Sequence, residues 1–198
     1  MDASGWDARY AETDRVWSAE PNRWVAAELV GLPAGRALDL AAGEGRNALW
    51  LAERGWQVTA VDFSAVALEK GRAEDLAGRV QWVHADVLDL VLDAGSYDLV
   101  IAAYLHLVAA ERRLVVGHAV RALAAGGVLF VVGHDTTNLT DGTGGPQHAD
   151  VLFTPSDIVD DLTASGEPVR IERADRVLRP VDGAPRQAID ALVHATRR

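Results

Sequence analysis

Residues 36–62 read RALDLAAGEGRNALWLAERGWQVTAVD, and this stretch decides the fold. A short apolar run leads into two glycines, Gly43 and Gly45, and the residues after them show the 3.6-residue period of an amphipathic helix. A second short run, rich in β-branched residues, ends at Asp62. The order strand, glycine turn, helix and strand predicts a βαβ unit with parallel strands.

The glycine turn predicts a site for a cofactor that carries an adenosine. Residues 43–48 satisfy the G-x-G-x-x-G/A pattern of a dinucleotide-binding turn, and the acidic Asp62 follows at the distance which that pattern requires. Glycine tolerates positive φ and lets a ligand approach the backbone, and the N-terminus of the following helix favours a phosphate or carboxylate. Asp62 is placed to accept hydrogen bonds from two ribose hydroxyls. A nicotinamide, a flavin or another adenosine-bearing cofactor would fit.

Strands and helices continue to alternate as far as residue 135. Further strands are expected at residues 80–86, 97–104 and 126–135, and helices from Ser64 as N-cap to Ala77 and over 108–125. Two alternating runs at 168–180 and 187–197 fit a pair of antiparallel strands at one edge of the sheet. The prediction is an α/β fold: a Rossmann-like, seven-stranded, mostly parallel sheet with one antiparallel strand and helices on both faces.

We expect a single domain over residues 1–198, made of four parts. Residues 1–35 form an N-terminal helical lid segment, and 36–135 form the cofactor-binding βαβ core. Residues 136–153 are a substrate-side loop dense in Gly, Thr and Asp. Residues 154–198 supply a C-terminal helix, with Thr154 as its cap and Pro155 in its first turn, and then a β-hairpin.

Composition excludes several classes of function. The net charge of −10 argues against a nucleic-acid partner, which needs a concentrated basic surface. No apolar run reaches the ~18 residues of a membrane span, and the N-terminus has no apolar signal-peptide core. The simplest expectation is a cytoplasmic protein. Because the chain has no cysteine, disulfides, thiolate metal sites and cysteine nucleophiles are excluded.

Three features separate the candidate cofactors. Asp39 lies inside the first strand, and Asp86 ends the third, where it could accept a hydrogen bond from the amino group of adenine. The two antiparallel runs fit a sheet with a reversed strand. In addition, an aromatic helical segment precedes the first strand, whereas a nicotinamide-binding domain usually starts with its glycine-rich strand.

The glycine turn, the three acidic residues Asp39, Asp62 and Asp86, and the antiparallel runs make the chain resemble the class I S-adenosylmethionine-dependent methyltransferases. The resemblance spans nearly the whole length of the chain. The stretch DLAAGEGRNALWLAERGWQVTAVDFS is similar to the small methyltransferases of the tellurite-resistance and thiopurine type. So are the leading GWDARY and VWSAEPNRWV and the late GTGGPQHADVLFTPSDI. The resemblance implies an enzyme that transfers a methyl group from S-adenosylmethionine to a small-molecule acceptor. It suggests a soft nucleophile, such as a thiol or a chalcogen oxyanion.

The resemblance also implies roles for individual residues. The glycine turn lies under the methionine part of the cofactor, Asp39 anchors that end, and Arg46 is placed for the methionine carboxylate. Asp62 binds the ribose, while Asp86 and the backbone at Val87 hold the adenine. Ala102 and Ala103 line the sulfonium end, and the aromatic rings of a lid formed by Trp6, Tyr10 and Trp17 can face a sulfonium cation. The whole implied cofactor set is Asp39, Ala41, Gly43, Gly45, Arg46, Asp62, Phe63, Asp86, Val87, Ala102, Tyr10 and Trp17.

Tyr104, His106 and His134 are the candidate catalytic residues. His106 follows the fourth strand and His134 ends the fifth, so both should open into the same cleft, with Asp135 beside them and His148 in the loop nearby. A histidine could remove a proton at neutral pH or only position the acceptor. No metal is expected. The glycine-rich residues 141–148 could close over the substrate.

Two other functions stay open. A nicotinamide-dependent reductase could use the same turn, although the Tyr-x-x-x-Lys pair is absent, since Lys70 is the only lysine. A non-catalytic cofactor-binding or partner-binding module would need only the cofactor motifs.

Overall fold

The structure, a computed structural model, describes residues 2–198. Its strands form a seven-stranded sheet in the order β3-β2-β1-β4-β5-β7-β6. The strand β7 is antiparallel to both of its neighbours, β5 and β6. The predicted seven-stranded, mostly parallel sheet with one reversed strand is therefore confirmed. The strands are β1 (Arg36–Leu40), β2 (Gln57–Asp62), β3 (Val80–His84), β4 (Tyr97–Ala103), β5 (Leu123–His134), β6 (Val169–Arg179) and β7 (Ala188–Arg197).

The helices follow the predicted alternation. They are α1 (Ala3–Ala11), α2 (Arg23–Leu29), α3 (Arg46–Glu53), α4 (Ala65–Glu74), α5 (Ala109–Ala122), α6 (Asn138–Asp141) and α7 (Pro155–Ala164), with a 3₁₀ turn at Ala149–Val151. Within residues 2–198, none of these helices has the length and apolar character to cross a membrane. The chain divides into two compact units, the first ending at Val91 and the second beginning at Leu92.

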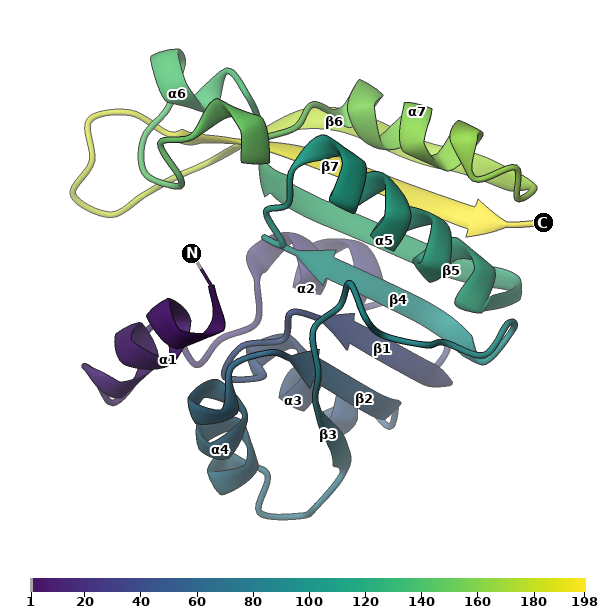
Figure 1. Cartoon of the computed structure of the whole chain (residues 1–198), viewed down its shortest axis with the longest axis horizontal. Helices are drawn as coiled ribbons and strands as arrows, with labels where there is room; N and C mark the ends of the chain where they lie inside the picture. The colour runs from purple at the N-terminus through teal and green to yellow at the C-terminus, as the bar shows by residue number, and fades with distance from the viewer. Residues whose placement is uncertain (1) are drawn as a thin grey trace. The chain divides into compact units, whose positions relative to one another are not determined.

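The first unit holds β1, β2 and β3, which are parallel to one another, together with α1 to α4 (Figure 1). The β1 side chains after Arg36 are all buried, as expected of a central parallel strand. Ser64 caps α4 as predicted, because its hydroxyl accepts a hydrogen bond from the N–H of Ala67. The buried face of α3, which includes Ala48 and Leu51, closes one side of this core.

The second unit holds β4 to β7, with α5 and α7 lying side by side over one face of β5 and β7 (Figure 1). Phe130 and Leu129 of β5 are fully buried in its core. The predicted start of α7 is confirmed, since Thr154 and Asp157 form a reciprocal capping box with Pro155 in the first turn. The antiparallel hairpin of β6 and β7 is also confirmed.

The structure differs from the expected boundaries in three places. The helix that begins after Ser64 ends at Glu74 rather than Ala77, and α5 ends at Ala122, where the long strand β5 begins at once. The loop expected over 136–153 carries α6 and the 3₁₀ turn. Such short turns have no apolar period of their own, so periodicity does not predict them.

Candidate active site

The glycine turn between β1 and α3 is built around Asp62. Ala41, Gly43 and Gly45 all have positive φ, at 57°, 58° and 79°. The N–H of Gly43 donates to Oδ2 of Asp62 at 2.7 Å, and the N–H of Ser64 donates to the other carboxylate oxygen, Oδ1, at 2.8 Å. These bonds fix the carboxylate at the end of β2, directly beside the turn. Each oxygen keeps a lone pair for a ligand.

Both glycines of the turn are required for space as well as for φ. A Cβ on Gly43 would lie 2.7 Å from the hydroxyl oxygen of Tyr10, and a Cβ on Gly45 would lie 2.2 Å from the ring of Trp82. Any side chain at either position would therefore displace an aromatic residue. The close approach of Tyr10 to Gly43 brings two residues of the implied cofactor set together.

Asp39 is a buried carboxyl group without a full set of partners. Its side chain is 1% exposed, and within residues 2–198 its Oδ2 makes no hydrogen bond. Burial raises the pKa of Asp39 to about 7, and the nearby charge of Asp62 raises it further, while Arg46 opposes the shift. An unsatisfied buried acid at the end of a strand is costly to stability, which points to a functional reason for keeping it.

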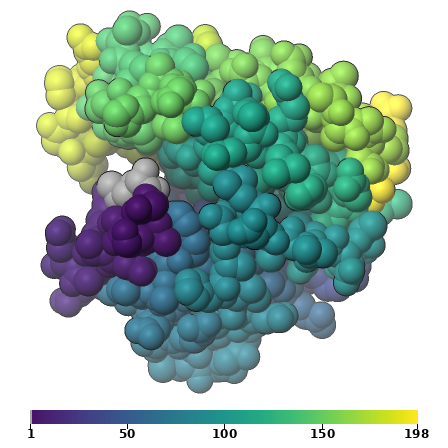
Figure 2. Space-filling view, viewed as in Figure 1, coloured from purple at the N-terminus to yellow at the C-terminus, as the bar shows by residue number. Residues whose placement is uncertain are grey.

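An aromatic cluster lies over the glycine turn. The indole N–H of Trp17 donates to the hydroxyl of Tyr10 at 3.3 Å, and the ring of Trp6 lies 5.6 Å from that of Tyr10. Burial raises the pKa of Tyr10 to about 12, so its hydroxyl stays protonated. Arg46 lies 5.9 Å from the ring of Trp17. Figure 2 shows this N-terminal segment in purple against the blue residues of the same unit.

Glu44, between the two glycines, anchors this segment. Its side chain is 3% exposed, and its carboxylate accepts hydrogen bonds from the backbone N–H groups of Val16 and Trp17 at 3.1 and 3.2 Å. The ammonium group of Lys70 lies 3.5 Å from Glu44 and donates to the carbonyl groups of Tyr10 and Thr13. Sequence reasoning missed the roles of both Glu44 and Lys70. The signal for Glu44 was an acidic residue inside a turn that is expected to be buried.

Two more contacts attach the segment. The carboxylate of Asp7 in α1 accepts a hydrogen bond from the hydroxyl of Ser64 at 2.5 Å, and the side-chain oxygen of Asn47 in α3 accepts one from the N–H of Asn22 at 2.9 Å. The predicted helical segment before the sheet is therefore tied to the first turns of both α3 and α4.

The remaining predicted cofactor residues of this unit follow β2 and β3. Asp86 is half-buried, and its Oδ1 accepts a hydrogen bond from the N–H of Leu88 at 2.9 Å, which closes a local turn. Val87 is buried. Phe63, next to Asp62, is half-buried, and its carbonyl group lies 2.9 Å from Nε2 of His84.

In the second unit the structure brings together all three predicted catalytic residues. The rings of His106 and His134 are stacked with centroids 5.4 Å apart, and the ring of Tyr104 lies 5.1 Å from that of His134. The backbone N–H of His134 donates to Nε2 of His106 at 3.3 Å. Tyr104 has a φ of 60°, in the left-handed region that a bulky residue rarely adopts. Strain of this kind is common at functional sites.

A buried acid that sequence reasoning missed organises this cluster. Asp190 of β7 is 0% exposed, and its Oδ2 accepts hydrogen bonds from the hydroxyl of Tyr104 and from Nε of Arg179, both at 2.8 Å. Nδ1 of His134 lies 3.4 Å from its other oxygen, Oδ1. The signal in the sequence was a single acidic residue within the apolar run of β7.

Burial keeps both histidines neutral. It lowers the pKa of His106 to about 4, and the neighbouring His134 lowers it further, while Asp190 opposes the shift. The pKa of His134 is also lowered, chiefly by burial, and again Asp190 acts in the opposite direction. Both rings are therefore uncharged bases at neutral pH. The usual imidazole pKa that sequence reasoning assumed does not hold here, because neither ring is well solvated.

The substrate-side loop, residues 136–153, packs on this cluster, but His148 does not join it. A Cβ on Gly145 would lie 2.5 Å from the ring of His134, and Asn138 holds the loop by donating to the carbonyl of Gly144 at 2.9 Å. His148 is exposed. Asp135 is buried, and its Oδ2 lies 2.9 Å from Nε of Arg176 in β6, so the two side chains form an ion pair.

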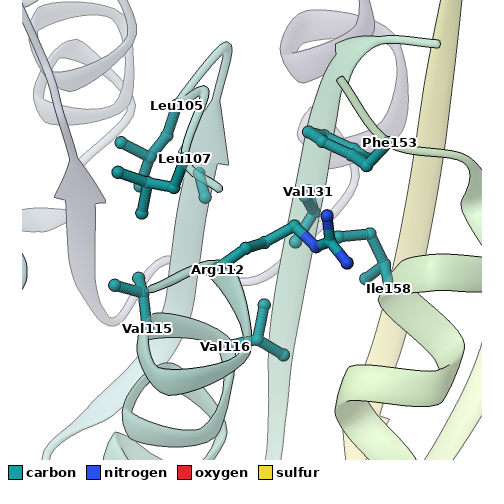
Figure 3. Close-up of a pocket in the computed structure, with 9 residues that line it drawn as sticks. Leu105, Leu107, Arg112, Val115, Val116, Val131, Phe153 and Ile158 are labelled. Carbon is teal, nitrogen blue, oxygen red and sulfur yellow. The ribbon is translucent and has the colours of Figure 1, made fainter. Parts of the chain in front are cut away.

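An apolar cavity of about 20 Å³ lies in the same unit (Figure 3). Ala102, which the resemblance assigns to the sulfonium end of the cofactor, forms part of its wall. The other walls come from the residues after β4 and from α5, β5 and α7, and the cavity is lined by Ala102, Leu105, Leu107, Arg112, Val115, Val116, Val131, Phe153 and Ile158.

Part of the chain is similar to known methyltransferases. Residues 37–127 match the methyltransferase domain family. The chain is also 38% identical over 120 residues to a demethylmenaquinone methyltransferase of Clavibacter sepedonicus, an alignment that covers 60% of this chain and 47% of that protein. The chain spans about half the length of the curated relatives it matches.

Solved structures confirm the methyltransferase fold. One, concerned with the conversion of a disulfide bond into a thioacetal group during echinomycin biosynthesis, has a TM-score of 0.76 at 23% identity and covers 98% of this chain and 91% of its own. A Burkholderia thailandensis 1,6-didemethyltoxoflavin-N1-methyltransferase, solved with S-adenosylhomocysteine, has a TM-score of 0.72 at 22% identity. The match covers 98% of this chain and 86% of that chain. These matches support the class I resemblance, but they do not single out the tellurite-resistance and thiopurine group.

Proposed function

We propose that this protein is an S-adenosylmethionine-dependent methyltransferase that acts on a small molecule. The observation that carries the proposal is the pairing of Asp62 with the glycine turn inside a methyltransferase domain. A carboxylate held beside a positive-φ turn suits a ribose next to a backbone that the methionine part of the cofactor can approach. The methyltransferase matches favour this cofactor over a nicotinamide.

The first unit supplies the cofactor contacts in this proposal. Asp62 accepts hydrogen bonds from the ribose hydroxyls, and Asp39 accepts one from the ammonium group of the methionine part. A cation there would stabilise the ionised form of Asp39, whose buried oxygen has no partner among residues 2–198. Arg46 pairs with the methionine carboxylate, and Asp86 and Val87 contact the adenine.

The aromatic cluster of the N-terminal segment covers the cofactor. Tyr10 and Trp17 lie over the glycine turn, and Glu44 and Lys70 hold the segment there. Electron-rich ring faces favour a sulfonium cation over its neutral product. The segment would also keep water away from the reacting atoms.

The acceptor is a soft nucleophile in this proposal, as in the thiopurine-type group. The matched proteins carry names that refer to a quinone, a ring nitrogen and a disulfide, so they do not select one acceptor. The apolar cavity wall favours an acceptor with an apolar body. A thiol on such a body fits this wall better than a free chalcogen oxyanion, which would lose its hydration there.

Methyl transfer is a displacement in which the acceptor's electron pair forms the new bond to carbon. When bound, S-adenosylmethionine would supply the methyl group on a sulfonium sulfur, which would keep the electrons of the broken carbon–sulfur bond and leave as a neutral thioether. The protein has mainly to align three atoms and exclude water. His134, neutral at neutral pH, can accept the proton of the acceptor, and Asp190, whose Oδ1 lies 3.4 Å from its Nδ1, would stabilise the imidazolium that forms. Nε2 of His106 already accepts the backbone N–H of His134, so His106 can only position the acceptor.

The test is a methyl-transfer assay that measures formation of S-adenosylhomocysteine with aromatic thiols, phenols and amines of matched shape. The proposal expects turnover with the thiols and slower or no turnover with the amines. Turnover with amines alone would contradict the soft-nucleophile assignment. If S-adenosylmethionine binds but no acceptor of any class is methylated, the non-catalytic alternative replaces the enzyme.

A further inference from the structure

One oxygen of the buried Asp190 is held by two side chains of the second unit. The hydroxyl of Tyr104 and Nε of Arg179 in β6 both donate to Oδ2 of Asp190, each at 2.8 Å. Nε of Arg179 also donates to the Tyr104 hydroxyl at 3.0 Å, so the groups of this hydroxyl are used within the protein. Tyr104 makes these contacts at a φ of 60°, a conformation that costs stability. Together the two donors fix which oxygen of Asp190 faces His134.

The other oxygen, Oδ1, determines the tautomer of His134. Nδ1 of His134 lies 3.4 Å from Oδ1, is buried, and within residues 2–198 has no hydrogen-bond partner. A proton on Nδ1 would point at a carboxylate oxygen. A lone pair on Nδ1 would instead face a negative charge and leave a buried acceptor without a donor. The neutral ring is therefore more stable with its proton on Nδ1 and its lone pair on Nε2.

Nε2 of His134 faces the substrate-side loop. It makes no hydrogen bond with the part of the chain that the structure describes. A Cβ on Gly145 would lie 2.7 Å from Nε2, so any side chain at residue 145 would press on this nitrogen. An acceptor that lies between this loop and the ring would meet the lone pair.

The charged groups around His134 cancel one another. They form two ion pairs, Asp190 with Arg179 and Asp135 with Arg176. The other titratable groups against the ring are Tyr104 and His106. None of these groups supplies an unpaired positive charge, so an anion placed here would lose its hydration without compensation. A neutral acceptor avoids that cost.

We propose that Tyr104 and Arg179 are positioning residues that aim Asp190 at His134, and that the acceptor is a thiol which binds in its neutral form. The inference rests on the proposed methyltransferase function. The S–H group of the acceptor points at Nε2 of His134. The S–H bond breaks, its proton moves to Nε2, and its electron pair forms the new bond to the methyl carbon. Asp190 then faces the imidazolium ion through Nδ1.

The test reads the tautomer of His134 from ¹⁵N NMR spectra that correlate the ring nitrogens with the ring C–H protons, assigned with H134Q. The decisive variant is D190N. Tyr104 and Arg179 donate at the place of Oδ2, so the new amide oxygen has to take that place, and the amide N–H group then donates to Nδ1. The matched control is D135N, which changes the other buried acid that pairs with an arginine of β6. Thermal unfolding shows which variants keep the fold.

The proposal expects the proton on Nδ1 in wild type and in D135N, and on Nε2 in D190N. Adding Y104F or R179M to D190N frees the amide to turn, so the proton should return to Nδ1 in a measurable fraction of molecules. A proton on Nε2 in wild type would overturn the proposal, and this spectrum decides even if D190N does not fold. A folded D190N without the exchange would also overturn it. An exchange that neither added substitution reverses would remove the positioning role.

The form of the acceptor is tested with two probes that share one hydrocarbon body. Phenylmethanethiol is neutral at pH 7, and phenylmethanesulfonate is an anion. The thiol should shift the Nε2 signal of His134, and the sulfonate should bind at least about 10-fold more weakly. Tighter binding of the sulfonate, or no shift with the thiol, would contradict a neutral acceptor. Because these readouts are spectroscopic, absence of methyl transfer alone would count against the proposed function and not against this assignment.

Discussion

At the scale of single residues, Asp39 is the clearest case of a side chain whose position costs stability. Its pKa in the folded protein is about 7, above the 3.8 of a solvated aspartate, because it is buried. The folded state therefore binds a proton that the unfolded state releases, and stability is lost as the pH rises from about 4 through 7. A group kept under such a penalty fits a role in cofactor binding.

The substitution Asp39→Asn should raise the free energy of unfolding, by about 1–3 kcal/mol at pH 8 and by less at pH 5. Affinity for S-adenosylmethionine should fall at the same time. Denaturant unfolding at both pH values and calorimetric titration measure the two effects. The exposed Asp89→Asn serves as the control and should change neither. Loss of stability at pH 8 in D39N would contradict the account of Asp39.

Asp62 is expected to dominate cofactor affinity. Removing its carboxylate in Asp62→Ala deletes the acceptor of two backbone N–H groups and of the ribose hydroxyls, so affinity for S-adenosylmethionine should fall at least about 10-fold. The exposed Glu69→Gln on α4 is a matched loss of charge that should leave affinity unchanged. Wild-type affinity in a folded D62A would remove the basis of the cofactor assignment.

His106 should make the protein sensitive to acid. Its folded-state pKa of about 4 lies below the unfolded value of 6.5, so its contribution to stability is complete above pH 6.5 and is lost as the pH falls toward 4. His106→Gln should reduce the loss of stability between pH 7 and pH 5 by about 1–2 kcal/mol. Denaturant midpoints at the two pH values measure this, with the exposed His148→Gln as control. An unchanged pH dependence in H106Q would show that His106 is solvated.

At the scale of elements, the N-terminal segment depends on one lysine. Lys70 of α4 donates to the carbonyl groups of Tyr10 and Thr13 and lies beside the buried Glu44. Lys70→Met should release the segment, so limited proteolysis within the first 20 residues should accelerate and S-adenosylmethionine affinity should fall about 3- to 10-fold. The exposed Arg79→Met controls for loss of a surface charge. Full protection from protease in K70M would contradict this anchoring.

The sequence predicted those features that depend on the residue pattern of a single helix or hairpin. The period and capping residues of α4 and α7 predicted where these helices begin, and the alternation of β6 and β7 predicted a hairpin. It failed to predict Asp190, Arg179 and Glu44 as site residues, because their partners are distant in the chain and depend on strand register or on how the N-terminal segment packs. The imidazole pKa values likewise depend on burial, which the sequence does not give.

At the scale of the whole molecule, the strand order is that of the methyltransferase fold, and residues 37–127 match the methyltransferase domain family. The aromatic segment before β1 and the antiparallel β7 distinguish this chain from a simple dinucleotide-binding domain. Both were predicted from the sequence, because each has its own pattern of residues. The expected single domain stays a prediction. So do the role of the N-terminal segment as a lid and the closing of residues 141–148 over the substrate.

The central claim is that the glycine turn binds S-adenosylmethionine, and calorimetric titration tests it most directly. The protein is titrated with S-adenosylmethionine and S-adenosylhomocysteine, with NADH and NADPH run alongside. The account predicts micromolar binding of the first pair and no binding of the second. Binding of a nicotinamide cofactor, with none of the sulfonium compound or its product, would contradict the account and leave only the fold in place.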